Sequence, residues 1–232
     1  MSGPPVVTVD GPAGSGKSTL GRRLALALGL PLIDTGLFYR GITWAAIRSG
    51  LDADHPEAVA ELARRTVVEV NTEPADPGWE VRVDGVDPGL LVRDPRHARL
   101  LSAISQIPEV RQHLLPLQRE PASHGAVAVG RDCGTVVFPE ATVKLYLLAE
   151  ESLRAERRRA QLAGRGERVD RGAARAEIAD RDLGDAASMA AAPDAVVIDT
   201  GTASIDEMEA IALRRCAAAG LLPHPPRTGE SR

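Results

Sequence analysis

The sequence has few cysteines, few aromatic residues and no long hydrophobic run. Its two cysteines, Cys133 and Cys216, lie far apart and outside any CxxC pattern. We therefore expect a reducing compartment, with neither a disulfide framework nor a zinc site. No apolar stretch approaches the ~20 residues that span a bilayer, and no signal-peptide pattern precedes Val6. The expected location is the cytoplasm, with no membrane partner. The aromatic content, 3% of residues, indicates no particular function.

The charge balance is mildly acidic, with a formal net charge of -4 at neutral pH. Proteins that bind the phosphate backbone of nucleic acids are usually basic, so a nucleic acid polymer is not an expected partner. Hydrophobic residues make up 44% and charged residues 26% of the chain. This composition suits one globular domain with a full core and room for a small inserted subdomain.

Buried-strand candidates alternate with helical segments along the chain. Strands are expected at 6–10, 31–34, 126–129, 143–148 and 195–199, because these runs are apolar and rich in β-branched residues. Helices are expected from Lys17 and over 36–49, 96–118 with a break near Pro108, 152–162 and 173–181. Ser204 and Glu207 form a capping box that opens the last helix. This alternation predicts an α/β fold with a parallel sheet, whose ligands bind at the carboxyl ends of the strands.

A different pattern occupies residues 67–87. The runs 67–71 and 79–83 have strand composition, and turn-forming residues including Pro74 and Gly78 separate them. A second turn at Asp84-Gly85 is expected to start another short strand, which makes this region a small antiparallel insertion. Two further segments are predicted to lack regular structure: 164–170 as a mobile loop, and 221–232 as a disordered tail.

The strongest motif is GPAGSGKS, from Gly11 to Ser18, which fits G-x-x-x-x-G-K-[ST]. It lies between a predicted strand and a predicted helix, where inward-turned backbone N–H groups and the helix N-terminus can hold phosphates. Lys17 can reach the β- and γ-phosphates, and Ser18 can coordinate Mg²⁺ that arrives with ATP. A chance glycine-rich turn is the alternative, which this context disfavours. No NKxD motif for guanine follows, and the chain is small for a motor ATPase. The expected ATP-binding residues are Gly11, Pro12, Ala13, Gly14, Ser15, Gly16, Lys17, Ser18 and Thr19.

Two further motifs, LIDTGLFYR after the second strand and GRDCGTVVFP in the middle of the chain, carry a family resemblance. Together with GPAGSGKST, they make the sequence resemble bacterial cytidylate kinases, of the nucleoside-monophosphate kinase group, from about Val6 to Leu213. The resemblance implies a P-loop NTPase-type three-layer fold with a parallel sheet, helices on both faces, a small antiparallel β insertion and a helical lid. It also implies one domain over 1–220, with the acceptor-binding insertion at about 62–95 and the lid at about 152–185. The implied partners are ATP with Mg²⁺ and a nucleoside monophosphate, and the implied state is a monomer.

The resemblance also assigns roles on the acceptor side. The implied acceptor-binding residues are Thr35, Arg40, Ser102, Arg111, Arg131, Asp132 and Asp185. Arg40 and Arg131 would hold the acceptor phosphate, because a planar guanidinium suits phosphate oxygens. A carboxylate at Asp132 accepts from the 4-amino group of cytosine, which favours that base over uracil. Without the motifs, Arg40 would be read as a solvated helix residue and Asp132 as a turn cap. Asp34 joins Ser18 as a candidate for Mg²⁺.

The segment implied as the lid is dense in arginine. Arg154, Arg157 and Arg158 lie at i, i+3 and i+4, and Arg181 follows downstream. Arginines over ATP can neutralise the charge of the transferring phosphoryl group, so Arg157 and Arg181 join Lys17 and Arg131 as expected catalytic residues. Arg157 is also expected to bind ATP. Interspersed glutamates favour a plain solvated face for Arg154 and Arg159. Replacing Arg131 with alanine is expected to raise the KM of the acceptor and to lower kcat.

Two departures from the family pattern leave the acceptor open. Val129 stands where an acidic residue is usual, and Ser188 stands where an arginine is expected, with no arginine between Arg181 and Arg214. Three hypotheses follow, in order of preference. The chain is a cytidylate kinase, which converts CMP or dCMP to the diphosphate, with weaker or altered acceptor binding; it is a specialised paralogue that phosphorylates a modified cytidine nucleotide or another small phosphorylated acceptor; or it is an ATP-binding regulator with little turnover.

Overall fold

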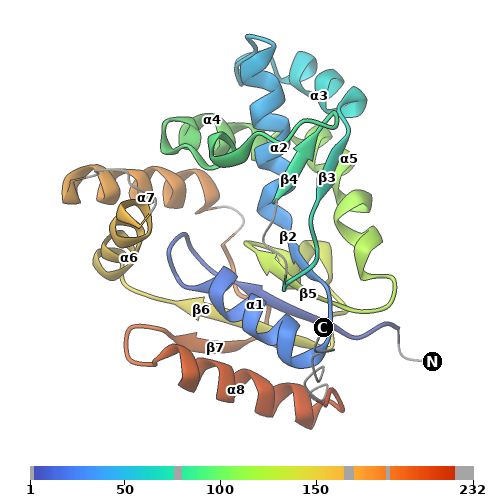
Figure 1. The fold of residues 1–232 in the computed structure, drawn as a ribbon, viewed down its shortest axis with the longest axis vertical. Coiled ribbons are helices and arrows are strands. Elements are labelled where there is room, and N and C mark those ends of the chain that lie inside the picture. The colour runs from blue at the N-terminus through green and yellow to red at the C-terminus, as the bar shows by residue number, and fades with distance from the viewer. Residues whose placement is uncertain (1–2, 76–79, 165–169, 187–188, 223–232) are drawn as a thin grey trace, which may run out of the picture.

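A computed structural model of the chain describes residues 3–75, 80–164, 170–186 and 189–222 (Figure 1). Its central sheet has the order β2-β5-β1-β6-β7, and all neighbouring strands run parallel. The strands are β1 (Val6–Asp10), β2 (Leu32–Asp34), β5 (Ala126–Gly130), β6 (Val143–Leu148) and β7 (Val196–Asp199). The five strands expected from the sequence are thus confirmed, with bounds that agree to within one residue.

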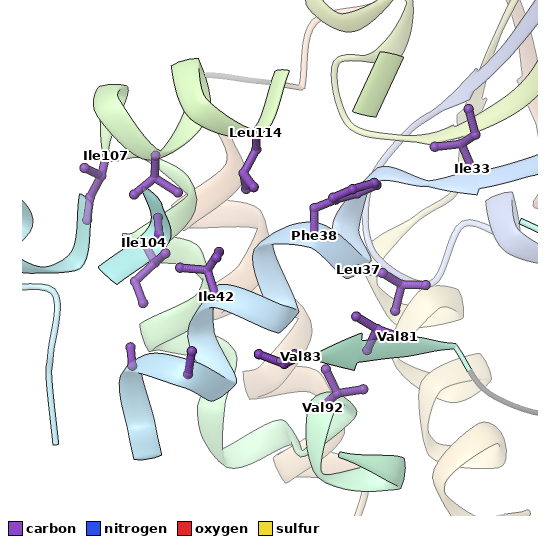
Figure 2. Packing of buried hydrophobic residues seen from close by; sticks show 14 of the residues in the cluster. Ile33, Leu37, Phe38, Ile42, Val81, Val83, Val92, Ile104, Ile107 and Leu114 are labelled. Carbon is purple, nitrogen blue, oxygen red and sulfur yellow. The ribbon is translucent and has the colours of Figure 1, made fainter. Parts of the chain in front are cut away.

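Side chains that alternate along the strands separate two cores. On one face, Val7 and Val9 of β1 pack with α1 (Lys17–Leu28) and α8 (Ile205–Ala218). On the other face lie α2 (Thr35–Arg48), α3 (Pro56–Arg65), α4 (Ala98–Ser105) and α5 (Pro108–Arg119). Figure 2 shows this second core, where Phe38 and Ile42 of α2 meet Ile104 and Leu114. Helices on both faces confirm the predicted three-layer arrangement.

The antiparallel insertion is present and shorter than predicted. Strands β3 (Val68–Val70) and β4 (Val81–Val83) pair with Val68 opposite Val83. The pair packs on α2, where a Cβ added to Gly41 would lie 2.8 Å from Val68 Cγ1. Across the described part of this region no third strand follows the turn at 84–85, and Val86 forms only an isolated bridge to Val83. The predicted turn residues 76–78 and Trp79, the predicted first residue of the second strand, lie outside the described residues. Two short helical turns, η1 (Gly89–Arg93) and η2 (Pro95–His97), lead into α4.

Helices α6 (Glu151–Ala163) and α7 (Arg171–Asp185) pack side by side at one end of the sheet (Figure 1). Helix α7 starts earlier than predicted because the side chain of Asp170 caps it by accepting from Ala173 N at 2.9 Å, and it also ends later than predicted, at Asp185. Its far side contacts α4. Most of the predicted mobile loop (165–169) and most of the predicted tail (223–232) lie outside the described residues. The domain limits inferred from the resemblance remain predictions.

The remaining elements are η3 (Glu120–Ala122) and η4 (Cys133–Val137), a single wide helical turn directly after the GRD motif. Helix α3 was not predicted, although Pro56 at its first turn and the buried Val59, Ala60 and Ala63 are a typical helix pattern. Over the described residues, no helix has the length and apolarity to cross a bilayer.

Candidate active site

The glycine-rich loop joins the end of β1 to the start of α1, at the carboxyl edge of the sheet. Gly11 has a φ of 143°, and a Cβ there would lie 2.4 Å from the carbonyl oxygen of Leu147. Gly14 has a φ of 75°, and a Cβ there would lie 2.9 Å from the carbonyl oxygen of Arg154. Both positions therefore require glycine. The buried hydroxyl of Ser15 has no protein partner.

Lys17 folds back over this loop. Its Nζ donates to the carbonyl oxygen of Pro12 at 2.7 Å. Burial lowers the pKa of Lys17 well below its usual value, and the neighbouring charges of Arg131 and Arg181 lower it further. A bound polyphosphate would stabilise the charged form of Lys17, because its negative charges offset those of the neighbouring cations.

A cavity of about 540 Å³ opens beside the loop, within the usual size range of small-molecule sites. Its wall combines the glycine-rich loop with residues of α2, α4, α6, α7 and the loop before α8. Cations dominate the charged residues of this wall: Lys17, Arg40, Arg93, Arg111, Arg131, Arg157, Arg158 and Arg181, against Asp34, Asp132 and Asp185. The surplus of cations fits a ligand with several negative charges.

Arg131 and Asp132 follow β5 and face the cavity from the acceptor side. Arg131 Nε donates to Asp185 Oδ2 at 2.7 Å, and its NH1 donates to the carbonyl oxygen of Gly11 at 2.7 Å. Its NH2 is buried without a protein partner. Asp132 contacts Arg111 of α5 directly through Oδ2 and NH2. The turn after β5 therefore offers one unpaired donor, Arg131 NH2, beside the pair formed by Asp132 and Arg111.

The remaining predicted acceptor residues also line the cavity. Arg40 NH1 donates to the carbonyl oxygen of Val92 at 2.9 Å. Burial lowers the pKa of Arg40 well below its usual value, with further contributions from Arg181 and Arg93. Thr35 already donates its hydroxyl proton to the carbonyl oxygen of Val129 at 3.0 Å, which leaves its oxygen as an acceptor only. Ser102 is 7% exposed and lies on α4.

The two helices α6 and α7 contribute cations with different roles. Arg157 donates to Oγ1 and to the carbonyl oxygen of Thr200, at 2.8 and 2.7 Å, and lines the cavity. Arg181 also lines it, and burial and Arg131 lower its pKa to about 10. This guanidinium therefore remains charged at neutral pH.

The expectation for Arg154 is wrong. It is 5% exposed, forms an ion pair with Asp182 at 2.5 Å and donates to the carbonyl oxygen of Ala13 at 3.1 Å. Arg154 therefore fastens both helices to the glycine-rich loop instead of lying on a solvated face. Arg159 does lie on an exposed face, where it pairs with Glu156.

The predicted oxygen donors for a metal lie in the same cavity wall. Ser18 is exposed to the cavity, and the Asp34 carboxylate accepts from Gly36 N at 3.1 Å. These hard oxygen atoms suit Mg²⁺ that binds together with phosphates. Among the residues that the structure describes, no group of three or more His, Cys, Asp or Glu could hold a metal by itself.

Sequence reasoning missed Arg93 and left Arg158 without a role. Arg93 lies at the end of η1, where its NH2 approaches Asp34 Oδ2 at 3.4 Å and its Nε contacts Glu80. Arg158 forms a buried bidentate pair with Glu177 and lines the cavity. No local motif surrounds Arg93, so only the fold of the insertion could bring it to the site.

Of the two departures from the family pattern, Val129 lies within the described residues and Ser188 does not. The side chain of Val129 packs in the core shared with α1, where a Cβ added to Gly21 would lie 2.3 Å from Val129 Cγ1. The valine therefore faces a helix on the far side of the sheet from Arg111. Ser188 lies outside the described residues.

Comparison with known proteins gives one consistent match. The model of the family described as "Cytidylate kinase" matches residues 7–217. The cytidylate kinase of Symbiobacterium thermophilum is 41% identical over 216 residues, which are 91% of this chain and 95% of that protein. That of Pelotomaculum thermopropionicum is 39% identical over 223 residues, 94% of this chain and 98% of that protein.

Some relatives are longer. The bifunctional pantoate ligase/cytidylate kinase of Synechococcus elongatus is 41% identical over 210 residues, and the chain spans only 40% of its length. Among solved structures, an uncharacterized protein from Eubacterium ventriosum shares the fold with a TM-score of 0.51 at 12% identity, covering 92% of this chain and 99% of that one.

Proposed function

The chain belongs to the cytidylate kinase family, and on that premise we propose that it transfers the γ-phosphoryl group of ATP to CMP or dCMP. The observation that carries the proposal is the pairing of Asp132 with Arg111 in the wall of a cationic cavity that also contains the glycine-rich loop. A carboxylate beside a guanidinium offers an acceptor next to donors. The cytosine edge offers the complement, a 4-amino donor beside ring acceptors.

The reaction needs no general base. An oxygen of the acceptor phosphate is already anionic near neutral pH, so it attacks the γ-phosphorus directly. The new P–O bond forms as the bond to the β-phosphate bridging oxygen breaks, and ADP leaves with that electron pair. Catalysis then rests on alignment and charge neutralisation.

The cations divide this work by position. Lys17 faces the loop that would hold the β- and γ-phosphates, and Arg131 lies between that loop and the acceptor turn. Arg157 and Arg181 reach the cavity from the two helices at the end of the sheet. Ser18 and Asp34 would hold Mg²⁺, which supplies charge neutralisation across the phosphates when bound. We also propose that the protein acts in the cytoplasm and that it is a monomer. Light scattering after size-exclusion chromatography tests the oligomeric state.

The direct test is an ADP-release assay with ATP and Mg²⁺ against CMP, dCMP, UMP, AMP and GMP, with a control that lacks any acceptor. We expect the highest kcat/KM with CMP or dCMP. Uniformly slow turnover with ATP still bound would instead favour a modified cytidine phosphate or another small phosphorylated acceptor. ATP binding without transfer to any acceptor would favour a regulatory protein.

A variant sharpens the assignment of the base. Asp132→Asn should lower the preference for CMP over UMP by roughly tenfold, because the amide can present a donor where the carboxylate only accepts. Glu109→Gln is the matched control, since Glu109 is an exposed acidic residue of the same helix as Arg111. An unchanged CMP:UMP ratio in Asp132→Asn would remove Asp132 from base recognition.

A further inference from the structure

One buried carboxylate beside the site belongs to none of the motifs. Asp10 ends β1 directly before the glycine-rich loop, and it is 5% exposed. Val7 and Val9 point to the face covered by α1 and α8, so Thr8 and Asp10 point to the opposite face. There Asp10 meets η4, the turn that follows Arg131 and Asp132.

Both carboxylate oxygens of Asp10 are used. Oδ1 accepts from the backbone N–H of Cys133 at 2.9 Å, and Oδ2 accepts from that of Gly134 at 2.7 Å. Because each oxygen binds a different N–H of consecutive residues, the carboxylate can neither rotate nor shift without losing a bond. A Cβ added to Gly134 would lie 2.9 Å from Thr8 Oγ1, so the turn sits directly on β1.

A second link runs in the opposite direction. Arg131, from the acceptor turn, donates to the carbonyl oxygen of Gly11 in the glycine-rich loop at 2.7 Å. We call the set of Asp10, Gly11, Arg131, Cys133 and Gly134 the cross-brace. In it, a side chain from each loop binds the backbone of the other, which fixes both their separation and their relative orientation.

We propose that Asp10 is a positioning residue that sets the distance between the ATP phosphates and the acceptor phosphate through the cross-brace. The inference rests on the proposed function, because it assigns the two loops to the donor and the acceptor. Misplacing reacting groups by about 1 Å can cost roughly 100-fold in rate, so a fixed connection of this kind is well matched to phosphoryl transfer.

The electrostatics of Asp10 favour this role over a purely structural one. Burial raises the pKa of Asp10 above its usual value, even though the N–H groups of Gly134 and Cys133 lower it. The ionised carboxylate is thus less favourable here than in water, although it satisfies two buried N–H groups. A neutral acceptor such as a hydroxyl could pair a backbone N–H group without this cost, so a structural cap alone does not require a carboxylate.

The test is Asp10→Asn, which keeps the size of the side chain but turns an amide NH₂ group toward one of the two N–H donors. We expect kcat/KM for CMP to fall about 100-fold. The dissociation constant for ATP and acceptor-free ATP hydrolysis should remain near wild-type values, and the unfolding temperature should fall by only a few degrees, because one buried hydrogen bond is lost. The control is Asp199→Asn, because Asp199 also ends a strand and accepts from a backbone N–H, that of Gly201 at 2.8 Å, but this bond stays within the loop that follows its own strand.

Gly134→Ala provides a second route that keeps the carboxylate and displaces the turn. It should give the same selective loss of transfer if Asp10→Asn does not fold. Wild-type kcat/KM in both variants, or a parallel loss of ATP binding, hydrolysis and transfer, would overturn the proposal. A wild-type chain that phosphorylates no monophosphate would instead refute the proposed function itself.

Discussion

At the scale of single residues, the cations around the cavity are held by groups of the protein itself. Arg157 binds Thr200, Arg158 binds Glu177, and Arg131 binds both Asp185 and the backbone of Gly11. Side chains fixed in this way need little reorganisation when charge develops during transfer. The cost is burial of charge together with mutual repulsion, and both lower the pKa values of Lys17 and Arg181.

These lowered values predict an alkaline limit to activity. The pKa of Arg181 is about 10, because burial and Arg131 disfavour its charged form, and Lys17 is shifted in the same direction. Both groups lose positive charge as the pH rises, so kcat/KM for ATP should fall as the pH approaches about 10. Bound phosphates favour the charged forms, so kcat at saturation should persist to higher pH. Parallel pH profiles of the two parameters measure this, and identical alkaline limbs would contradict it.

Residues within compact motifs could be predicted from the sequence, because neighbours along the chain fix their surroundings. Lys17 and Arg131 are of this kind. Arg154 could not, because its partners Ala13 and Asp182 are 141 and 28 residues away. The glutamates near Arg154 in the sequence indicated a solvated face. The packing of α6 on the glycine-rich loop buries this side chain instead.

At the scale of elements, Arg154 joins α6, α7 and the glycine-rich loop. Removal of one partner from a buried ion pair leaves an uncompensated charge, here that of Asp182. Arg154→Ala should therefore lower the free energy of unfolding by about 3 kcal/mol, whereas Arg159→Ala should change it by less than about 0.5 kcal/mol. Chemical denaturation of both variants measures the difference. Equal effects would mean that the buried contacts of Arg154 do not persist in solution.

The contact between α7 and α4 depends on Gly184. A Cβ there would lie 2.5 Å from Ser102 Cβ, and the carbonyl oxygen of Gly184 accepts from Gln106 Nε2 at 3.0 Å. Gly184→Ala should push α7 away from the helix that carries Ser102. Overpacking of this kind costs about 1–3 kcal/mol and bears directly on Ser102, so we expect the KM of CMP to rise roughly tenfold, by a larger factor than the KM of ATP.

Gly164→Ala is the control for that variant, because it adds a methyl group at the end of α6, where no described residue lies closer than 3.5 Å to the new Cβ. A CMP KM that rises equally in both variants would point to a general disturbance of the two helices. Wild-type kinetics in Gly184→Ala would show that α7 and α4 separate at no cost.

Helices and strands were predicted correctly where the spacing of apolar residues and the positions of capping and turn residues agreed. β1 and β5 are buried runs dominated by valine and alanine, and the capping box of Ser204 and Glu207 fixes the start of α8. Helix α3 was missed because its apolar positions are mostly alanine and valine, which give a weak pattern next to the strand-like 67–71. The packing of α7 on α4 has no signal in either helix alone, since it depends on Gly184 meeting a residue 82 positions earlier.

At the scale of the whole molecule, a chain of net charge -4 concentrates cations in one cavity. The repulsion among them destabilises the ligand-free protein, so a polyphosphate should stabilise it. ATP at about 100 times its dissociation constant contributes about 2.7 kcal/mol, which corresponds to roughly 5–10 °C in Tm for a chain of this size. Differential scanning fluorimetry with ATP, and with inorganic tripolyphosphate, measures the shift.

Lys17→Met is the informative variant for this measurement. It removes one repelling charge, so its ligand-free Tm should equal or exceed that of the wild type, while its shift with tripolyphosphate should be smaller. A lower ligand-free Tm together with an undiminished shift would show that Lys17 stabilises the fold and does not bind phosphate. Arg159→Ala, on the exposed face of α6, serves as the control for loss of a positive charge.

The common direction of the five strands has a further consequence for how this unit can be joined to another polypeptide. All five strands point their carboxyl ends at the cavity, while β1 starts and α8 ends near the opposite edge (Figure 1). A partner polypeptide joined through either of these elements would not obstruct substrate entry. The bifunctional pantoate ligase/cytidylate kinase of Synechococcus elongatus carries the matching unit within a longer protein. The geometry thus makes this end of the sheet the place where a gene fusion leaves the approach to the cavity open.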